Sequence, residues 1–222
     1  MKKNKRPARD LYEGRWIFLI LGIGLLVGLL VARRPLAGLL PIVGGLILFS
    51  LWFFRDPERI PPADPALAVS PADGTVTLVD EVVEEQFFKR RMKRVSIFLS
   101  VFDVHVNRTP IAGGVLFTEG RGGLYLDARK PEASVLNESL FWAIGSKESP
   151  DQAIGVKQIT GAIARRIVPW AEVGESLVRG ERFGMIRFGS RTDLYLPLDA
   201  EVLVSVGQKV KGGETSIARM VS

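Results

Sequence analysis

Two long uncharged runs near the start of the chain limit what it can fold into more than any other feature of the sequence. They cover residues 16–32 and 35–54 and are separated by Arg33 and Arg34. As helices they would measure roughly 25 and 30 Å, close to the hydrocarbon thickness of a bilayer. The sequence therefore predicts two hydrophobic membrane helices over residues 16–54.

Charge predicts the orientation of this hairpin. Six basic residues stand among residues 1–15, whereas the turn carries two, and basic residues favour the cytoplasmic side of a membrane. We therefore expect a basic cytoplasmic N-terminus over residues 1–15 and a cell-membrane protein whose main domain lies on the cytoplasmic side. A cleaved signal peptide is the other interpretation of the first run, but arginines follow it directly and no small-residue cleavage pattern is present.

Composition narrows the partners of the chain. The absence of cysteine excludes a disulfide framework and thiolate chemistry. A net charge of +6 favours anionic lipid. Nucleic acid is the other common partner of a basic chain, but no nucleic-acid-binding motif is visible, so we expect none to bind. A single histidine without cysteine also predicts that no metal is bound.

The remainder of the chain predicts a mainly β domain. Residues 55–68 are rich in proline, which cannot continue a helix, and are expected to form a linker. Within residues 69–222, short β-branched runs are separated by glycine, proline and aspartate, as is typical of strands. The clearest of these runs are residues 95–99, 154–159, 163–168, 185–188 and 194–196.

A nine-residue pattern occurs twice in this domain. Residues 173–181 read VGESLVRGE and residues 206–214 read VGQKVKGGE. Each copy places two glycines where tight turns need positive φ, with one apolar residue between them that can fill the core. The pattern resembles the turn-strand unit of biotinyl and lipoyl carrier domains, so we expect a flattened β sandwich or barrel.

Gly189 and Ser190 form a pair that can carry chemistry, although a Gly-Ser pair alone is usually a β-turn. A protein that cuts its own backbone needs a hydroxyl next to a peptide carbonyl, and a preceding glycine tolerates the strained geometry best. Ser190 could attack the carbonyl of Gly189. Elimination from the resulting ester, followed by hydrolysis, would leave a pyruvoyl group on residue 190 and release ammonia. A base must take the proton of the Ser190 hydroxyl.

Four stretches of the domain resemble the phosphatidylserine decarboxylase family. They read SPADG at 70–74, FDVHVNRTP at 102–110, QITGAIARRIV at 158–168 and GERFGMIRFGSRTDLYLP at 180–197. The resemblance is to the short, single-serine form of this family with an N-terminal membrane hairpin. It implies a proenzyme that cleaves itself after Gly189 into residues 1–189 and 190–222, and these two products stay paired without a covalent bond.

The resemblance also implies the reaction. The pyruvoyl group derived from Ser190 would form a Schiff base with the amine of phosphatidylserine, or of a related serine phospholipid, and accept electrons as carbon dioxide leaves. The product would be phosphatidylethanolamine, and no dissociable cofactor would be needed. The sequence leaves open whether the lipid carries acyl or ether chains and whether the chain forms homo-oligomers.

His105 is the only histidine in the sequence and can act as acid or base near neutral pH. Its alternative is a purely structural role. Many members of the family carry a second histidine, linked to self-cleavage, where this chain has Arg108. The cleavage base is therefore His105 or Asp73 acting alone. Asp73 and Asp103 are candidate partners of a base, Asp103 and Arg108 are candidate substrate-binding residues, and either aspartate could instead only shape a turn.

Two other functions compete with decarboxylation. A membrane-tethered, carrier-like adaptor without catalysis would need only the nine-residue repeat. A serine hydrolase would use an intact Ser190, but the GxSxG pattern is absent because Phe188 stands in place of its first glycine. A further basic segment, residues 87–94, begins with two phenylalanines and is either a solvated hairpin tip or a membrane-surface contact.

Overall fold

The computed structural model describes residues 9–30, 40–146, 148–162, 166–187 and 189–221, and only the backbone of residues 9–14 and 27–30. Several sequence predictions lie outside these ranges, namely those for residues 1–8, the turn at Arg33 and Arg34, residues 163–165 and Phe188. Contacts divide the chain into two compact units, Met1–Pro57 and Glu58–Ser222. We describe each unit by itself.

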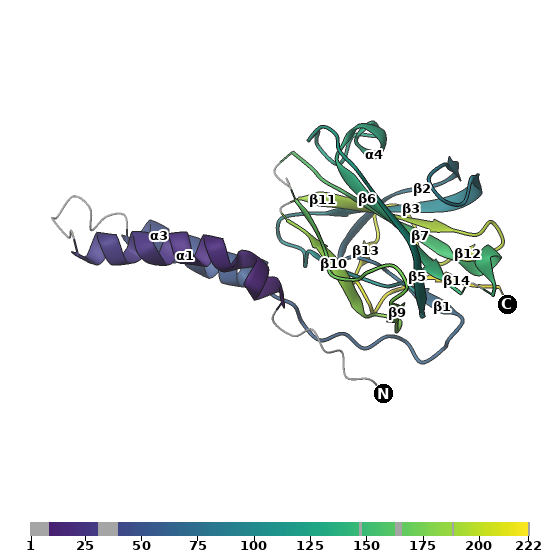
Figure 1. Ribbon diagram of the computed structural model, residues 1–222, viewed down its shortest axis with the longest axis horizontal. Coiled ribbons are helices and arrows are strands. Elements are labelled where there is room, and N and C mark those ends of the chain that lie inside the picture. Colours follow the sequence, from purple (N-terminus) through teal and green to yellow (C-terminus); the bar gives the residue numbers. More distant parts are fainter. Residues whose placement is uncertain (1–8, 31–39, 147, 163–165, 188, 222) are drawn as a thin grey trace. The chain divides into compact units, whose positions relative to one another are not determined.

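The first unit contains two helices that pack against each other, α1 (Arg9–Leu30) and α3 (Leu40–Phe53) (Figure 1). The ring of Phe18 on α1 meets that of Phe54, directly after α3, edge to face at 5.9 Å. Large apolar side chains stay exposed on both helices, among them Ile20 and Leu48. Among the residues that the structure describes, no helix has both the length and the apolarity needed to cross a bilayer.

The second unit is mainly β, as predicted (Figure 1). In its described residues the largest sheet is antiparallel and has eight strands, in the order β13 (Lys209–Val210), β2 (Gly74–Glu84), β3 (Arg90–Leu99), β11 (Ser190–Leu196), β7 (Ile154–Ile159), β6 (Ser139–Gly145), β5 (Gly113–Arg121) and β9 (Ser176–Leu177). Two three-stranded sheets flank it, β1 (Leu67–Val69), β14 (Ser216–Arg219) and β12 (Glu201–Val202), and β4 (Val106–Arg108), β10 (Arg182–Ile186) and β8 (Ile167–Pro169). Two short helical turns complete the unit, α4 (Ala133–Leu136) and a 3-10 turn, η1 (Pro150–Gln152).

The eight-stranded sheet curls into a half-barrel around the main hydrophobic core (Figure 1). Side chains alternate along β11, so Leu194 and Leu196 join this core while Tyr195 joins a smaller cluster on the other face. The ring of Trp142 on β6 meets that of Phe183 on β10 edge to face at 5.2 Å, which joins the large sheet to a small one. The core is therefore enclosed by a curled sheet and its two flanking sheets.

The two copies of the nine-residue repeat form the two edge strands of the large sheet. Leu177 in β9 and Val210 in β13 are buried in the core, as the pattern predicts. β9 pairs with the start of β5 at Gly113, and β13 pairs with the start of β2 at Gly74. The four glycines of the pattern all have positive φ, between 79 and 90°: Gly174, Gly180, Gly207 and Gly213.

Each copy of the repeat is also hydrogen-bonded to a Ser-Pro or Thr-Pro pair that precedes the neighbouring strand. The N–H of Gly213 donates to the carbonyl of Ser70, and the N–H of Gly180 donates to that of Thr109, both at 2.8 Å. The hydroxyls of Ser70 and Thr109 each donate to the carbonyl two residues further on, at 2.7 and 2.8 Å. A proline follows both residues. The repeating unit is thus a Ser/Thr-Pro turn, a long strand and a glycine-flanked edge strand.

The proline-rich segment is held against the second unit from Glu58 onward. Arg179 donates to the carbonyl oxygens of Pro62, Asp64 and Leu67, the last two at 2.5 and 2.6 Å. Arg59 forms ion pairs with Asp73 at 2.8 Å and with Glu214 at 3.2 Å. This segment, predicted as a linker, therefore supplies side chains to the domain that follows it.

The repeat glycines give a direct test of the predicted backbone requirement. Gly207 has φ +90° and no atom within 4 Å of the position of an added Cβ, so Gly207→Ala should cost only conformational energy, about 1–2 kcal/mol of unfolding free energy. Thermal unfolding of the full chain in detergent measures this loss. Gly122→Ala is the matched control, because that site also has open space but no positive φ. Equal destabilisation by the two substitutions would contradict the conformational role.

Candidate active site

Four inner strands of the large sheet have ends that lie together, at the edge of the sheet that runs across the strands. Strands β2, β3, β11 and β7 are neighbours and antiparallel, so β2 and β11 begin where β3 and β7 end. The residues just beyond these four ends come from the four stretches that resemble the decarboxylase family. We call this place the motif edge; it contains Asp73 before β2, residues 100–105 after β3, Gly189 before β11 and Gly161 after β7.

Ser190 is the first residue of β11 and pairs with Leu99 of β3. Its side chain is fully buried, and its hydroxyl has no hydrogen-bond partner among the described residues. Because buried hydroxyls are normally bonded, such an orphan is a reactive candidate. Gly189 before it has φ +64°, a conformation that glycine adopts without steric cost. A hydroxyl that can act as a nucleophile thus directly follows a glycine with left-handed backbone conformation.

The carbonyl of Gly189 packs against Gly161. A Cβ on Gly161 would lie 2.3 Å from the oxygen and 3.2 Å from the carbon of this carbonyl. Backbone can approach backbone this closely only where there is no side chain. Gly161 therefore holds the peptide group that precedes Ser190, a role that sequence analysis did not give it.

His105 is fully buried beside Gly189. The N–H of Gly189 donates to Nε2 of His105 at 3.1 Å, and Nδ1 lies 2.9 Å from the carbonyl oxygen of Asp103. Because a carbonyl only accepts, Nδ1 carries the proton and Nε2 offers its lone pair to Gly189. The structure thus brings together His105, Gly189 and Ser190, with the imidazole in one neutral tautomer.

Asp73 lies at the motif edge but is engaged elsewhere. One carboxylate oxygen pairs with Arg59 at 2.8 Å and the other accepts the N–H of Gly212 at 2.7 Å. Burial raises the pKa of Asp73, while the charge of Arg59 opposes this rise. Because β3 lies between β2 and β11, the backbones of Asp73 and Ser190 are roughly 10 Å apart, two strand spacings.

The side chains of Asp103 and Arg108, the other two predicted residues, form hydrogen bonds to backbone groups. The carboxylate of Asp103 accepts the N–H and the hydroxyl of Ser100, at 2.8 and 2.7 Å, and closes the turn before His105. Arg108 is 2% exposed, and its guanidinium donates to the carbonyl of Gly180 at 3.1 Å. Asp103 therefore shapes the histidine turn, and Arg108 contacts one copy of the repeat.

A buried polar network beneath the motif edge escaped sequence analysis. The amide nitrogen of Asn107 donates to the hydroxyl of Thr192 at 3.1 Å and to the carbonyl of Pro71 at 3.2 Å. Gln158 donates to Asn107 at 2.8 Å and accepts the indole N–H of Trp142 at 2.8 Å. All of these side-chain groups are satisfied, so the network fixes the histidine segment against β11 and β7.

A cavity of about 390 Å³ reaches Gly189 at this edge. Asp127 and Arg129 pair at its wall at 2.6 Å, and hydrogen bonds from Arg129 lower the pKa of Asp127 to about 2. The cavity is otherwise mainly apolar and contains the hydroxyl of one serine. Its lining consists of Phe98, Ser100, Val101, Asp127, Ala128, Arg129, Ala162 and Gly189.

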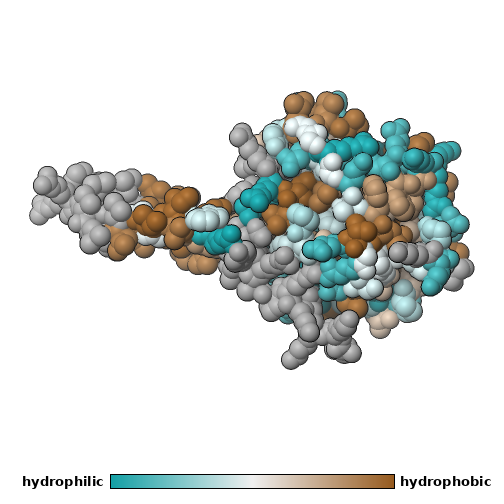
Figure 2. All heavy atoms as spheres, in the orientation of Figure 1, coloured by the Kyte–Doolittle hydropathy of each residue, from teal (hydrophilic) through white to brown (hydrophobic). Residues whose placement is uncertain are grey.

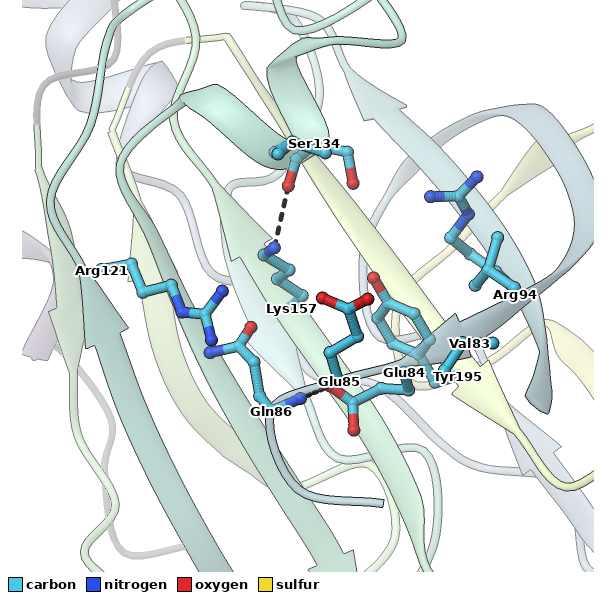
Figure 3. A pocket seen from close by; sticks show the side chains of 11 residues that line it. Val83, Glu84, Glu85, Gln86, Arg94, Arg121, Ser134, Lys157 and Tyr195 are labelled. Carbon is cyan, nitrogen blue, oxygen red and sulfur yellow. Dashed lines mark hydrogen bonds between the residues drawn. The ribbon is translucent and has the colours of Figure 1, made fainter. Parts of the chain in front are cut away.

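A second cavity, of about 270 Å³, lies on the opposite face of β11 (Figure 3). Lys157 points into it and donates to the carbonyl of Ser134 at 2.8 Å, and burial lowers the pKa of this lysine. Alternation along β11 directs Tyr195 to this cavity and Ser190 to the other face. The polar cavity of Figure 3 is therefore separate from the motif edge.

Comparison with known proteins connects this geometry to an enzyme family. Residues 46–218 match the family described as phosphatidylserine decarboxylase. A phosphatidylserine decarboxylase proenzyme of Symbiobacterium thermophilum is 48% identical over 199 residues, 87% of this chain and 92% of that protein. Proteins of the same name from Trichlorobacter lovleyi and Carboxydothermus hydrogenoformans are each 45% identical, over 93% and 97% of this chain and 90% and 99% of their own lengths.

The contact between Gly161 and Gly189 predicts a defect in self-cleavage. Gly161→Ala should displace the Gly189 carbonyl, because its Cβ would lie 2.3 Å from that oxygen, and uncut chain should accumulate on denaturing gels. Gly120→Ala is the matched control, since an added Cβ there comes no nearer than 3.7 Å to another atom. Normal cleavage in the Gly161 variant would show that the close approach has no part in preparing the bond.

Proposed function

Because the chain belongs to the phosphatidylserine decarboxylase family, we propose that its self-cleavage occurs between Gly189 and Ser190 and that His105 serves the reaction that follows. The chain is a self-processing decarboxylase proenzyme, a carboxy-lyase that uses a pyruvoyl group derived from a serine. The substrate that we propose is phosphatidylserine. The observation that carries the assignment is the buried, unpartnered Ser190 hydroxyl directly behind the left-handed Gly189.

The residues around position 190 suit a pyruvoyl group. Its precursor hydroxyl is already excluded from water, and the cavity beside Gly189 leaves room for a headgroup. When present, the group accepts the electron pair released as carbon dioxide leaves the substrate. The protein supplies position, exclusion of water and proton transfer.

In the uncut chain His105 holds the N–H of Gly189, the residue before the bond to be cut. Its Nε2 lone pair is bound to the N–H of Gly189, so we propose that a different group accepts the Ser190 proton. Asp73 is the candidate, because burial raises its pKa and makes it a better base than an ordinary carboxylate. Because roughly 10 Å separates the two backbones, the proton must reach Asp73 through intervening groups. A slow route of this kind suffices because each chain is cut only once.

After cleavage we propose that His105 moves a proton during turnover. Its Nδ1 stays fixed by the Asp103 carbonyl, so Nε2 is the atom that faces the residue 190 side. Asp103 and Arg108 remain proposed substrate-binding residues. For Asp103 the support is its bond to Ser100, which lines the cavity. For Arg108 the bond to Gly180 indicates that it also holds backbone.

The two cleavage products should remain together. Strand β11 belongs to the shorter product, residues 190–222, and is hydrogen-bonded on both sides to β3 and β7 of the longer one. Leu194 and Leu196 are also buried in the common core. A strand held between two neighbours and buried in this way has no free path out without unfolding the sheet.

We further propose that α1 and α3 hold the protein at the membrane with the catalytic unit on the cytoplasmic side. Both helices pack together and still expose large apolar side chains, with Ile20 67% and Leu48 69% exposed. The excess of basic residues before the first run over those in the turn supports cytoplasmic ends.

Replacing His105 separates its two proposed jobs, because no other histidine can substitute. His105→Ala should still be cut, since another group takes the Ser190 proton, but should release carbon dioxide about 100-fold more slowly, the scale of losing a general acid. Gel analysis and carbon dioxide release measure the two effects. Ser190→Ala, which should be neither cut nor active, is the control. Accumulation of uncut His105→Ala chain would instead make His105 the cleavage base.

The proposed topology predicts protection of both ends in intact cells. Cysteines placed at Lys5 and at Gln208 should be shielded from a membrane-impermeant thiol reagent, and the absence of natural cysteines makes the assay clean. Labelling after the cells are opened is the control for reactivity. Labelling of either position from outside would reverse the orientation.

A further inference from the structure

An exposed apolar surface is formed by segments that also line the cavity at the motif edge. The chain leaves the large sheet after Arg121 and returns at Ser139, which pairs with Arg121 and with Ile159 at the end of β7. Residues 122–138 therefore extend from the same edge as Gly161. This segment exposes four large side chains and the turn after β3 exposes a fifth, and we call them the apolar rim: Leu124, Tyr125, Val135, Leu136 and Phe102. Figure 2 shows hydrophobic side chains gathered over α4 and the loop before it.

The apolar rim is fastened to the candidate active site. The side chain of Asn137 donates to the carbonyl of Thr160 at 2.8 Å, next to Gly161, and accepts the N–H of Leu126 at 2.9 Å. Residues 127–129 of the same segment line the cavity at Gly189. The segment that carries four of the five rim side chains is therefore held beside this cavity.

The basic segment 87–94 is a less suitable membrane contact than its sequence indicates. The ring of Phe87 stacks on Phe117 at 5.2 Å, and that of Phe88 meets Phe141 edge to face at 6.4 Å. Both phenylalanines thus pack on the outer face of the sheet. Their apolar surface is directed toward the protein.

The volume of the cavity indicates which partner the apolar rim contacts. A volume of about 390 Å³ is at the low end of the range for small-molecule sites, so it holds a headgroup but not two acyl chains. The chains of a bound lipid must stay in the bilayer while the headgroup lies at Gly189. We infer that the apolar rim inserts into the interface of an anionic bilayer and turns the cavity toward its headgroups. This inference rests on the proposed function.

The composition of the rim fits this partner. Aromatic side chains such as Phe102 and Tyr125 are favoured at the boundary between water and lipid. Val135 is 81% exposed on a short helix that presents it away from the core.

Fluorescence quenching in reconstituted vesicles tests the contact directly. The chain has no cysteine, so Val135→Cys and Val173→Cys each carry one environment-sensitive label. Val173 is the matched control, because it is also exposed, at 57%, but lies far from the apolar rim. The next residue, Gly174, donates its N–H to the carbonyl of Val115 near the start of β5. Val115 is roughly 20 Å along that strand from Arg121, where the rim segment begins. Lipids brominated in their acyl chains should quench the label at position 135 at least twofold more than the label at 173. Equal quenching would overturn the inference.

Kinetics separate this inference from the proposed function. Val135→Asp should lower the rate on phosphatidylserine in vesicles about tenfold and leave the rate on soluble glycerophosphoserine unchanged, whereas Val173→Asp should alter neither. Normal self-cleavage of both variants reports that they fold. An unchanged vesicle rate for Val135→Asp would refute docking by the rim. Wild-type protein that releases no carbon dioxide from either substrate would refute the proposed function, while the quenching result would still decide the docking.

Discussion

The hydrogen bonding of β11 between β3 and β7 is the constraint on which the rest of the candidate active site depends. It places Ser190 at the first position of a central strand, where the hydroxyl is buried and faces the core side. It also puts the preceding Gly189 between the ends of β3 and β7. His105 then bonds the N–H of Gly189, and Gly161 packs against the carbonyl of the same residue.

Antiparallel order explains why residues from four distant stretches meet. Neighbouring antiparallel strands begin and end at alternate edges, so Asp73, His105, Gly161 and Gly189 come to one edge of the sheet. The internal repeat sets the limits of this sheet. Each copy closes one side with a two-residue strand, and its glycines turn the chain back toward a Ser/Thr-Pro turn. Related units thus close the two sides of the half-barrel, while the motif edge lies at the ends of β2, β3, β11 and β7.

Sequence patterns predicted those features of the fold whose requirements are local. The positive φ of the repeat glycines and the buried Leu177 and Val210 each follow from what a few neighbouring residues need. Cleavage at the Gly189-Ser190 pair stays a prediction. Strand pairing is not local, so the sequence could not show that β3 separates Asp73 from Ser190. For the same reason the network of Asn107 and Gln158 was not predicted. Arg59, in a segment expected to be a linker, was also missed as the partner of Asp73.

The most direct test of the account is the intact mass of the purified wild-type protein. We expect two chains, one ending at Gly189 and one starting at residue 190, with the second lighter by one ammonia than a chain that begins with serine. Tandem mass spectrometry would place this loss on residue 190. An active protein that remains a single chain, or a second chain that begins with intact Ser190, would contradict the proposed origin of the catalytic group.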